Sequence, residues 1–296
     1  MVVKQTQGIR IPKKYLYNAG VAVFAVVTAT LVAREMIIPK SIPSCAMRYE
    51  KTGLFTWQRG DGRLLAPLDL QAKLNGRDWG VLDNVSFRKT EDLQYGSAMD
   101  VRLPREAGKS RDARSPSGTG FIWAPSWLKG SEQACLGYSI AMPDKFKFGT
   151  GGSLPGLFGG DSDAASNIEE DQSGGFYTRM NWRDNGKLEV RYKSVEQPTG
   201  INFTIDKDGL RIEPGRWLRI EQEVVLNTPG EANGILRIWI DGELRLERKK
   251  LVYRSKPGET LAGVVANVHY ATRDLKWAPA PQNTALSLSP FLINWK

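Results

Sequence analysis

The chain has 296 residues, enough to bury a full-sized core as one large β domain or as two smaller domains. Its formal net charge is +9, but residues 1–40 hold six lysine or arginine residues against one acidic residue, so +5 lies there and +4 remains for the rest. The larger part of the chain is only mildly basic, which argues against the broad cationic surface of a nucleic-acid-binding protein.

An uncharged apolar stretch runs from Leu16 to Ala33, after a basic segment that lacks acidic residues. Its length lies between that of a short transmembrane helix and that of a signal peptide. Leu-Val-Ala before Arg34 is a mediocre cleavage site, because a large residue stands where a small one is needed, so an uncleaved signal anchor is favoured. The basic residues place the N-terminus (1–15) in the cytoplasm and the remaining chain in the periplasm or outside the cell.

Residues 34–48 are predicted to be a linker, and residues 49–296 one domain, because no break in composition divides them. Cys45 and Cys135 follow the apolar stretch, where the compartment can be oxidising. They form either one disulfide or two free buried thiols. Their spacing indicates no metal site.

From Tyr49 onward, short runs of alternating polarity are separated by turn residues. The expected strands are 81–88, 95–103, 119–123, 134–141, 176–183, 188–193, 217–226, 234–240, 243–248, 263–268 and 287–294. Asp241-Gly242 is the clearest two-residue hairpin turn. No convincing amphipathic helix interrupts the strands, so the pattern predicts an all-β protein, an antiparallel sandwich preceded by one N-terminal transmembrane helix.

The glycine-rich stretch 149–160 is predicted to be a loop, whose backbone turns sharply or approaches another group closely. A hairpin follows at 175–194. Strand alternation puts its outward-facing polar side chains on one face and its apolar ones on the core face. The residues of the polar face are Tyr177, Arg179, Asn181 and Arg183.

The loop length of this hairpin decides which residues lie opposite one another. A two-residue turn at Asn185-Gly186 would direct Arg191 into the core, whereas a three-residue loop with a left-handed Gly186 keeps the apolar residues together. The three-residue loop pairs Arg179 with Arg191, Tyr177 with Lys193 and Asn181 with Glu189. We choose it. Two opposed arginines cost stability unless an anion is bound between them.

Other catalytic patterns are largely missing from the sequence. His269 is the only histidine, and there is no Gly-x-Ser-x-Gly elbow, metal-ligand cluster, P-loop or dinucleotide fingerprint, so no cofactor or metal is expected. The loop 161–174 is rich in carboxylates that could act as a pair in glycoside hydrolysis, although a solvated loop is the more ordinary explanation. These carboxylates are Asp161, Asp163, Glu169, Glu170 and Asp171.

The stretch Gly151–Gly160 resembles the Gly-Gly-Lys-Leu-Pro-Gly-Leu-Tyr-Gly-Gly motif of polysaccharide lyase families 14 and 20, the alginate and glucuronan lyases. The resemblance covers roughly residues 80–296. It continues at 179–183, at 214–217 running into 220–222, at 226–230, through 234–242, and at 277–279. It implies a β-jelly roll, a concanavalin-like sandwich whose concave sheet forms the sugar cleft.

The resemblance also implies a β-elimination, which needs a uronate carboxylate neutralised, the C5 proton removed and the bridging oxygen protonated. Arg179 matches the family's carboxylate clamp. Ser153 stands where the motif carries a lysine, and Arg191 and Lys193 stand where alginate lyases usually carry two tyrosines. The candidate catalytic residues are Arg179, Lys193, Tyr177 and His269, and the candidate substrate-binding residues are Ser153, Asn181, Arg183, Arg191 and Tyr270.

Three functions remain open from the sequence. The first is a membrane-anchored lyase that cleaves an anionic polysaccharide outside the cytoplasm. The second is a polysaccharide-binding protein of an export or cell-surface system that kept the carboxylate grip and lost the chemistry. The third is an assembly subunit whose sandwich face binds a protein partner. The lyase is the favoured interpretation, with an anionic polysaccharide and the membrane as its partners.

Overall fold

The computed structural model describes residues 42–105, 117–160, 175–205, 209–274 and 276–296. Residues from Pro43 to Lys296 form one compact unit. The N-terminal segment 1–15, the expected anchor 16–33 and the acidic loop 161–174 lie outside the described residues, as does the linker up to residue 41. Within the described ranges, no helix is both long and apolar enough to cross a membrane.

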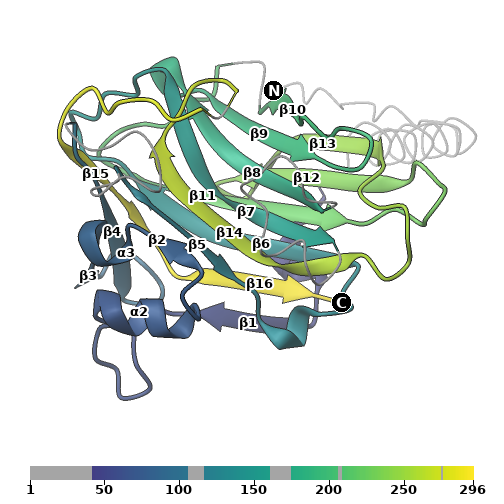
Figure 1. Cartoon of the computed structure of the whole chain (residues 1–296), viewed down its shortest axis with the longest axis horizontal. Coiled ribbons are helices and arrows are strands. Elements are labelled where there is room, and N and C mark those ends of the chain that lie inside the picture. Colours follow the sequence, from purple (N-terminus) through teal and green to yellow (C-terminus); the bar gives the residue numbers. More distant parts are fainter. Residues whose placement is uncertain (1–41, 106–116, 161–174, 206–208, 275) are drawn as a thin grey trace, which may run out of the picture. The chain divides into compact units, whose positions relative to one another are not determined.

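Two antiparallel sheets form the described unit (Figure 1). The first sheet runs in the order β13 (Glu243–Leu251), β12 (Gly234–Ile240), β11 (Trp217–Val225), β6 (Gln133–Ala141), β15 (Thr284–Leu288), β4 (Ser97–Leu103) and β3 (Val85–Lys89). In addition, β16 (Phe291–Trp295) pairs with β6 and with β1 (Lys51–Phe55).

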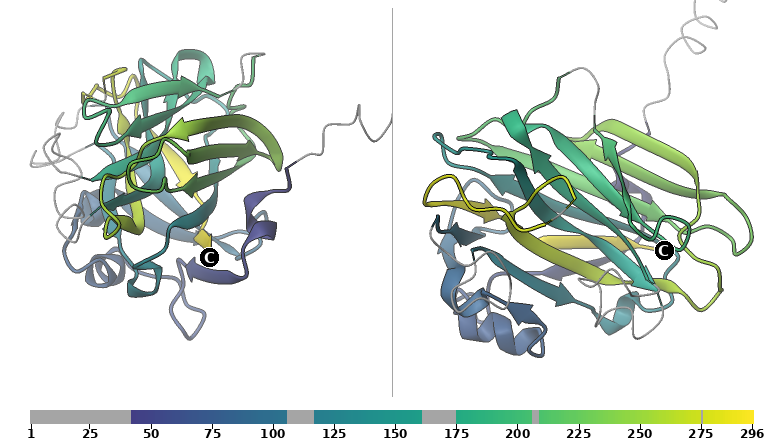
Figure 2. Two further views of the ribbon diagram at one scale, coloured as in Figure 1. Left: turned by 90° about the vertical axis from the view of Figure 1, so that its right-hand side faces the viewer. Right: turned by 45° about the horizontal axis from the view of Figure 1, so that its top comes forward.

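The second sheet runs in the order β10 (Ile201–Thr204), β9 (Leu188–Lys193), β8 (Phe176–Arg183), β7 (Gly151–Gly160), β14 (Thr260–Tyr270), β5 (Thr119–Trp123) and β2 (Asp78–Trp79). Its long strands run side by side in the right-hand view of Figure 2. The helical segments are η1 (Cys45–Arg48), α2 (Pro67–Lys73), α3 (Val81–Asn84), η2 (Ser126–Leu128) and η3 (Asp184–Gly186).

One hydrophobic core lies between the sheets, and strand alternation decides what enters it. Leu136 and Ile238 of the first sheet share this core with Met180, Val190 and Val264 of the second. The residues between them along each strand of the second sheet therefore point away from the core. We call this surface the outer face of the second sheet. The all-β sandwich is confirmed, and its two antiparallel sheets are consistent with a jelly roll.

Residues 151–160 correct the predicted loop, because they form β7 in the middle of the second sheet. The glycines are needed for close approach within the sheet. A Cβ atom on Gly152 would lie 1.9 Å from the indole of Trp182, and one on Gly156 would lie 1.7 Å from the carbonyl oxygen of Thr178. The prediction of close approach is thus confirmed, while the prediction of a loop is wrong.

Several other predicted elements also need correction. Residues 81–88 begin with the short helix α3 before β3, and the run 287–294 spans parts of two strands, β15 and β16. The strands β1, β2 and β10 were not predicted, nor was helix α2. This helix has Pro67 at its first turn and Asp69 accepting a hydrogen bond from the Ala66 N–H at 2.7 Å, so its start signal was present in the sequence.

Both predicted hairpin loops are confirmed. Ile240 pairs with Glu243, and the two residues between them have positive φ, 50° for Asp241 and 83° for Gly242. In the second hairpin, Arg179 pairs with Arg191 across β8 and β9, as the three-residue loop 184–186 requires.

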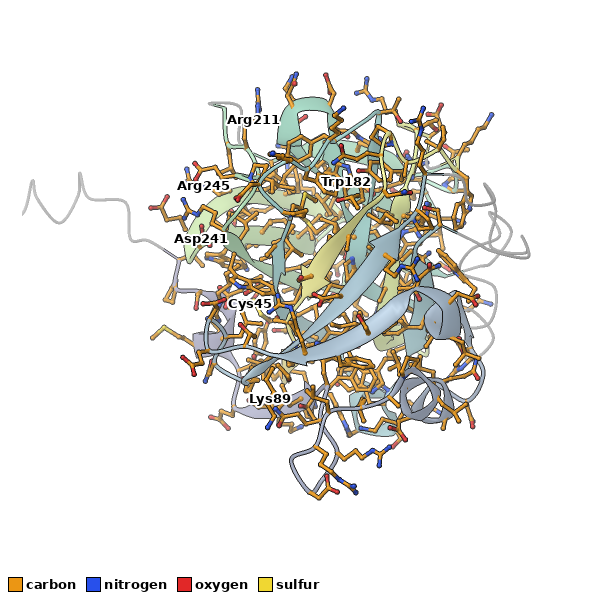
Figure 3. All side chains as sticks on the ribbon, turned by 90° about the vertical axis from the view of Figure 1, so that its left-hand side faces the viewer. Cys45, Lys89, Trp182, Arg211, Asp241 and Arg245 are labelled. Carbon is orange, nitrogen blue, oxygen red and sulfur yellow. A yellow bond between two sulfur atoms is a disulfide. The ribbon has the colours of Figure 1, made fainter. Side chains whose placement is uncertain are left out.

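Cys45 and Cys135 form a disulfide between η1 and β6 (Figure 3), which decides between the two alternatives left by the sequence. Both residues are buried. The bond spans 90 residues and fixes the chain just before β1 to the middle of the first sheet.

Replacing Gly156 by alanine should destabilise the fold by about 1–3 kcal/mol, because the added methyl group would overlap the β8 backbone. The free energy of unfolding from chemical denaturation measures this loss. Gly258→Ala is the matched control, since a Cβ there meets nothing within 4 Å. It should change stability by no more than about 0.5 kcal/mol. Equal stability of the two variants would contradict close packing at Gly156.

Candidate functional site

The outer face of the second sheet carries its polar residues in rows that cross the strands. One row runs from His269 on β14 through Ser153 and Asn181 to Glu189 on β9. The middle row has Arg179 of β8 at its centre. In order across the strands, it consists of Val265 (β14), Gly156 (β7), Arg179 (β8), Arg191 (β9) and Asn202 (β10). A third row contains Phe158, Tyr177 and Lys193.

Two opposed arginines form the centre of this face. Arg179 and Arg191 are only 6% and 9% exposed, although both point away from the core. Arg191 donates a hydrogen bond to the Thr199 carbonyl, yet the Nε atoms of both arginines have no hydrogen-bond partner among the described residues. Two like charges side by side and partly desolvated repel each other. An anion bound between them would remove this cost.

Tyr177 lies against the arginine pair, with the Arg179 guanidinium carbon 4.5 Å from its ring centre and the Lys193 ammonium 5.9 Å from it. Burial by itself would raise the pKa of the phenol. The positive charges of Arg179 and Arg191, together with their hydrogen bonds to the phenol, outweigh burial and bring this pKa below its ordinary value of 10.0. Tyr177 therefore loses its phenol proton more readily than a free tyrosine does.

His269 lies at the other side of the face, two strands away from Arg179. Its Nδ1 is 3.0 Å from the carbonyl oxygen of Tyr270. A carbonyl only accepts, so Nδ1 carries the proton of the neutral ring and Nε2 has the lone pair. The ring stacks on Trp277 at 4.1 Å and meets the edge of Trp79 at 5.8 Å, which together form an aromatic platform.

Tyr270 does not reach the outer face, and this corrects its expected role in substrate binding. It follows His269 on the same strand, so alternation turns its ring into the core, where it packs against Trp182 and Phe146. Its hydroxyl donates a hydrogen bond to the Lys147 carbonyl at 2.6 Å.

Arg183 faces the same side as Arg179, but its guanidinium is already engaged. Nε donates to Glu189 at 2.7 Å, and the two Nη atoms donate to the carbonyls of Thr272 and Arg273, both at 3.2 Å. These bonds tie the hairpin to the segment after β14. Arg183 therefore has a structural role that the sequence pattern did not reveal.

Buried polar atoms without partners gather on this face. Ser153 Oγ, both amide atoms of Asn181 and Asn267 Oδ1 have no hydrogen-bond partner in the described part of the chain. Buried polar groups in proteins are nearly always hydrogen-bonded, so this group points to a polar ligand. Asn267 was not predicted, although its place two residues before His269 puts it on the same face. Asn202, with an unpartnered Oδ1 beside Arg191, was missed because β10 was missed.

Among the described residues, neither a metal site nor a carboxylate pair explains this face. Within the described ranges, no group of three or more histidine, cysteine, aspartate or glutamate residues could hold a metal ion. The one carboxylate in the rows, Glu189, is paired with Arg183. The available chemistry is that of arginine, lysine, tyrosine, amide and imidazole groups.

The sequence profile of a family described as polysaccharide lyase 14 matches residues 91–289. A comparison with curated protein sequences gives no match. Among solved structures, the PL-14 alginate lyase from Aplysia kurodai has a TM-score of 0.64 and 20% identity, over 84% of this chain and 99% of that one. Alginate lyase vAL-1 from Chlorella virus has a TM-score of 0.60 and 18% identity, over 77% and 97%.

The endo-β-1,4-glucuronan lyase from the fungus Trichoderma reesei has a TM-score of 0.51 and 14% identity, over 72% of this chain and 87% of that one. At these identities, the likeness to the three solved structures shows a shared fold.

The lowered pKa of Tyr177 can be tested without any substrate. Titration of the tyrosinate absorbance should show one phenol that ionises earlier than the others, and Tyr177→Phe should remove it. Arg191→Ala should move this pKa upward, because one of the two charges that lower it is gone. Tyr192→Phe is the control, since Tyr192 faces the core and donates to the Val252 carbonyl. An early phenol that persists in Tyr177→Phe would contradict the assignment.

Proposed function

Because the chain belongs to the polysaccharide lyase 14 family, we propose that it cleaves a uronic-acid polysaccharide by β-elimination on the outer face of the second sheet. The observation that carries this proposal is the buried pair of opposed arginines with Tyr177 against both. A carboxylate is the anion that two guanidinium groups fit best, since each can donate two parallel hydrogen bonds. A uronate unit supplies that carboxylate next to the carbon whose proton must leave.

In the proposed reaction, the two arginines stabilise the negative charge that develops on the substrate. Arg179 and Arg191 bind the uronate carboxylate and stabilise the negative charge that develops on it when the C5 proton is removed. The electron pair of the C5–H bond forms the C4–C5 double bond, and the C4–O bond breaks. The leaving oxygen takes up a proton. Two arginines supply the positive charge that this reaction needs, so the proposed mechanism is independent of a metal ion.

We assign the proton transfer to Tyr177. It neighbours Arg179 on the same face, and the arginine charges favour its phenolate, which can accept the C5 proton. Lys193 lies opposite Tyr177 and can donate to the leaving oxygen. His269 is two strands from Arg179 and three from Arg191, so we place it in binding, where its platform with Trp277 and Trp79 supports a neighbouring sugar ring.

The neighbours with solved structures are named for alginate and for glucuronan, and both are polymers of uronic acids. We propose a substrate of this class. Ser153 and Asn181 lie in the adjacent row with unpartnered buried atoms, which fits hydrogen bonding to sugar hydroxyls.

A second function is favoured by one departure from the family motif. Ser153 occupies the position of the motif's lysine, and a hydroxyl cannot replace that charge. A protein that binds the polysaccharide without cleaving it would keep Arg179 and Arg191 and would not need a base. The two functions differ in whether the unsaturated product forms.

The decisive experiment is ultraviolet absorbance of the unsaturated product, with the purified full-length protein and alginate, glucuronan or other polyuronates. We expect product from at least one polymer, and a loss of about 100-fold or more in Arg179→Ala. Arg88→Ala is the control, because Arg88 pairs with Asp100 on the first sheet. Polymer binding without product from any substrate would favour the binding protein. If the protein neither binds a polyuronate nor releases an unsaturated product, both proposed functions are rejected.

We further propose that the domain is exported and held by the N-terminal apolar stretch 16–33. The support is the sequence of that stretch and the disulfide Cys45–Cys135, a bond typical of oxidising compartments. In a bacterial host, the full-length protein should sediment with membranes, and protease added to spheroplasts should degrade it. A chain without residues 1–33 should stay protected in the cytoplasm. Protection of the full-length protein in intact spheroplasts would contradict export.

A further inference from the structure

A cavity of about 590 Å³ lies at the hairpin end of β8 and β9, next to the rows of the outer face. Its lining includes Arg183 and Glu189, together with Lys187, Arg211 and Arg273. The volume is in the range of pockets that bind small ligands. None of the last three residues belongs to the proposed catalytic cluster.

The charges around this cavity do not balance. Arg183 and Glu189 neutralise each other in a buried ion pair. Lys187, Arg211 and Arg273 then face a single remaining carboxylate, that of Asp184. In the described part of the chain, none of the three cations forms an ion pair, and Arg211 donates only to its neighbour's carbonyl, at 3.2 Å. Among its described lining residues, the cavity therefore carries more positive than negative charge, and Asp184 is the one carboxylate outside the Arg183–Glu189 pair.

The cavity shares a strand residue with the rows of the outer face. Glu189 lines the cavity and also lies opposite Asn181 in the row beside the arginine pair. Arg183 is four residues from Arg179 on β8, about 13 Å along the strand. Away from the hairpin end, Phe158 and Tyr177 belong to a separate hydrophobic cluster with Val265, and Lys193 is the cation opposite Tyr177. At the hairpin end, Lys187, Arg211 and Arg273 gather around the cavity.

We propose that this cavity is a second anionic subsite, which binds the carboxylate of another uronate unit in the same polymer chain. This inference rests on the proposed function. The guanidinium groups of Arg211 and Arg273 hold the carboxylate, and Lys187 adds a point charge at the rim. Because it lies beyond the arginine pair along β8, the subsite favours chains long enough to reach both places.

The test compares oligouronates of two lengths, measured by binding to the full-length protein and to Arg211→Ala/Arg273→Ala. We expect the affinity for an octasaccharide to fall roughly tenfold, with weaker salt dependence, because exposed ion pairs are lost. Affinity for a trisaccharide should not change, since it occupies the arginine pair alone. The turnover number at saturation should also stay the same. Lys89→Ala/Arg102→Ala is the charge-matched control, from exposed positions on β3 and β4 of the first sheet.

Figure 3 shows Lys89 and Arg211 at opposite ends of the molecule, so the control leaves the cavity intact. Parent-like affinity of the cavity variant for the octasaccharide would overturn the subsite and leave the proposed function standing. A protein that binds neither oligosaccharide would overturn the function, and a second measurement then addresses the cavity alone. Free glucuronate at constant ionic strength should raise the melting temperature of the parent more than that of the cavity variant. Equal shifts would overturn the subsite.

Discussion

The outer face of the second sheet depends on two hydrogen bonds that cross the core to the backbone of β7. The Tyr138 hydroxyl donates to the Pro155 carbonyl, and the Gln222 side-chain carbonyl accepts from the Leu157 N–H, both at 2.9 Å. Between Ser153 and Gly156 the pairing of β7 with β8 shifts register. A proline has no N–H for the ladder, and an irregular strand leaves backbone groups that must be satisfied when buried. The first sheet supplies these partners and so fixes which residues of the second sheet meet.

The shift in register has a direct consequence for the site. It sets Ser153 opposite Asn181 and the side-chain-free Gly156 opposite Arg179, so the arginine has space above the neighbouring strand. The arginine pair itself costs stability, because two buried cations repel each other. The same two positive charges lower the pKa of Tyr177 by stabilising its phenolate, so the cost in stability and the shifted pKa have one origin. This is the pattern expected where a stable fold carries a functional site.

The features that follow from strand alternation could be predicted from the sequence. The features that depend on contacts between residues far apart in the chain could not. The β8–β9 register followed from keeping Val190 in the core, and the structure has that register. The glycines of β7 led to the wrong prediction of a loop. They are required because the Trp182 ring and the backbone of β8 leave no room for a Cβ atom, which the local sequence does not reveal. Tyr270 was assigned to the site although its neighbour His269 already took that face. The bonds of Arg183 to residues 272 and 273 span about ninety positions in the chain, and no local pattern encodes them.

The lysine of this site lies at a different position from the lysine of the family motif. The family motif has a lysine where this chain has Ser153 on β7, and this chain has Lys193 on β9, opposite Tyr177. Lys193 lies two strands from position 153, on the side of the arginine pair where the phenol of Tyr177 lies. A lysine at position 153 would stand between His269 and Asn181, in a row that now offers only neutral hydrogen-bonding groups and a neutralised Glu189. The proposed proton transfer next to Tyr177 and the proposed sugar binding next to Ser153 divide this face between two rows, so Ser153 in place of the motif's lysine is compatible with the proposed catalysis.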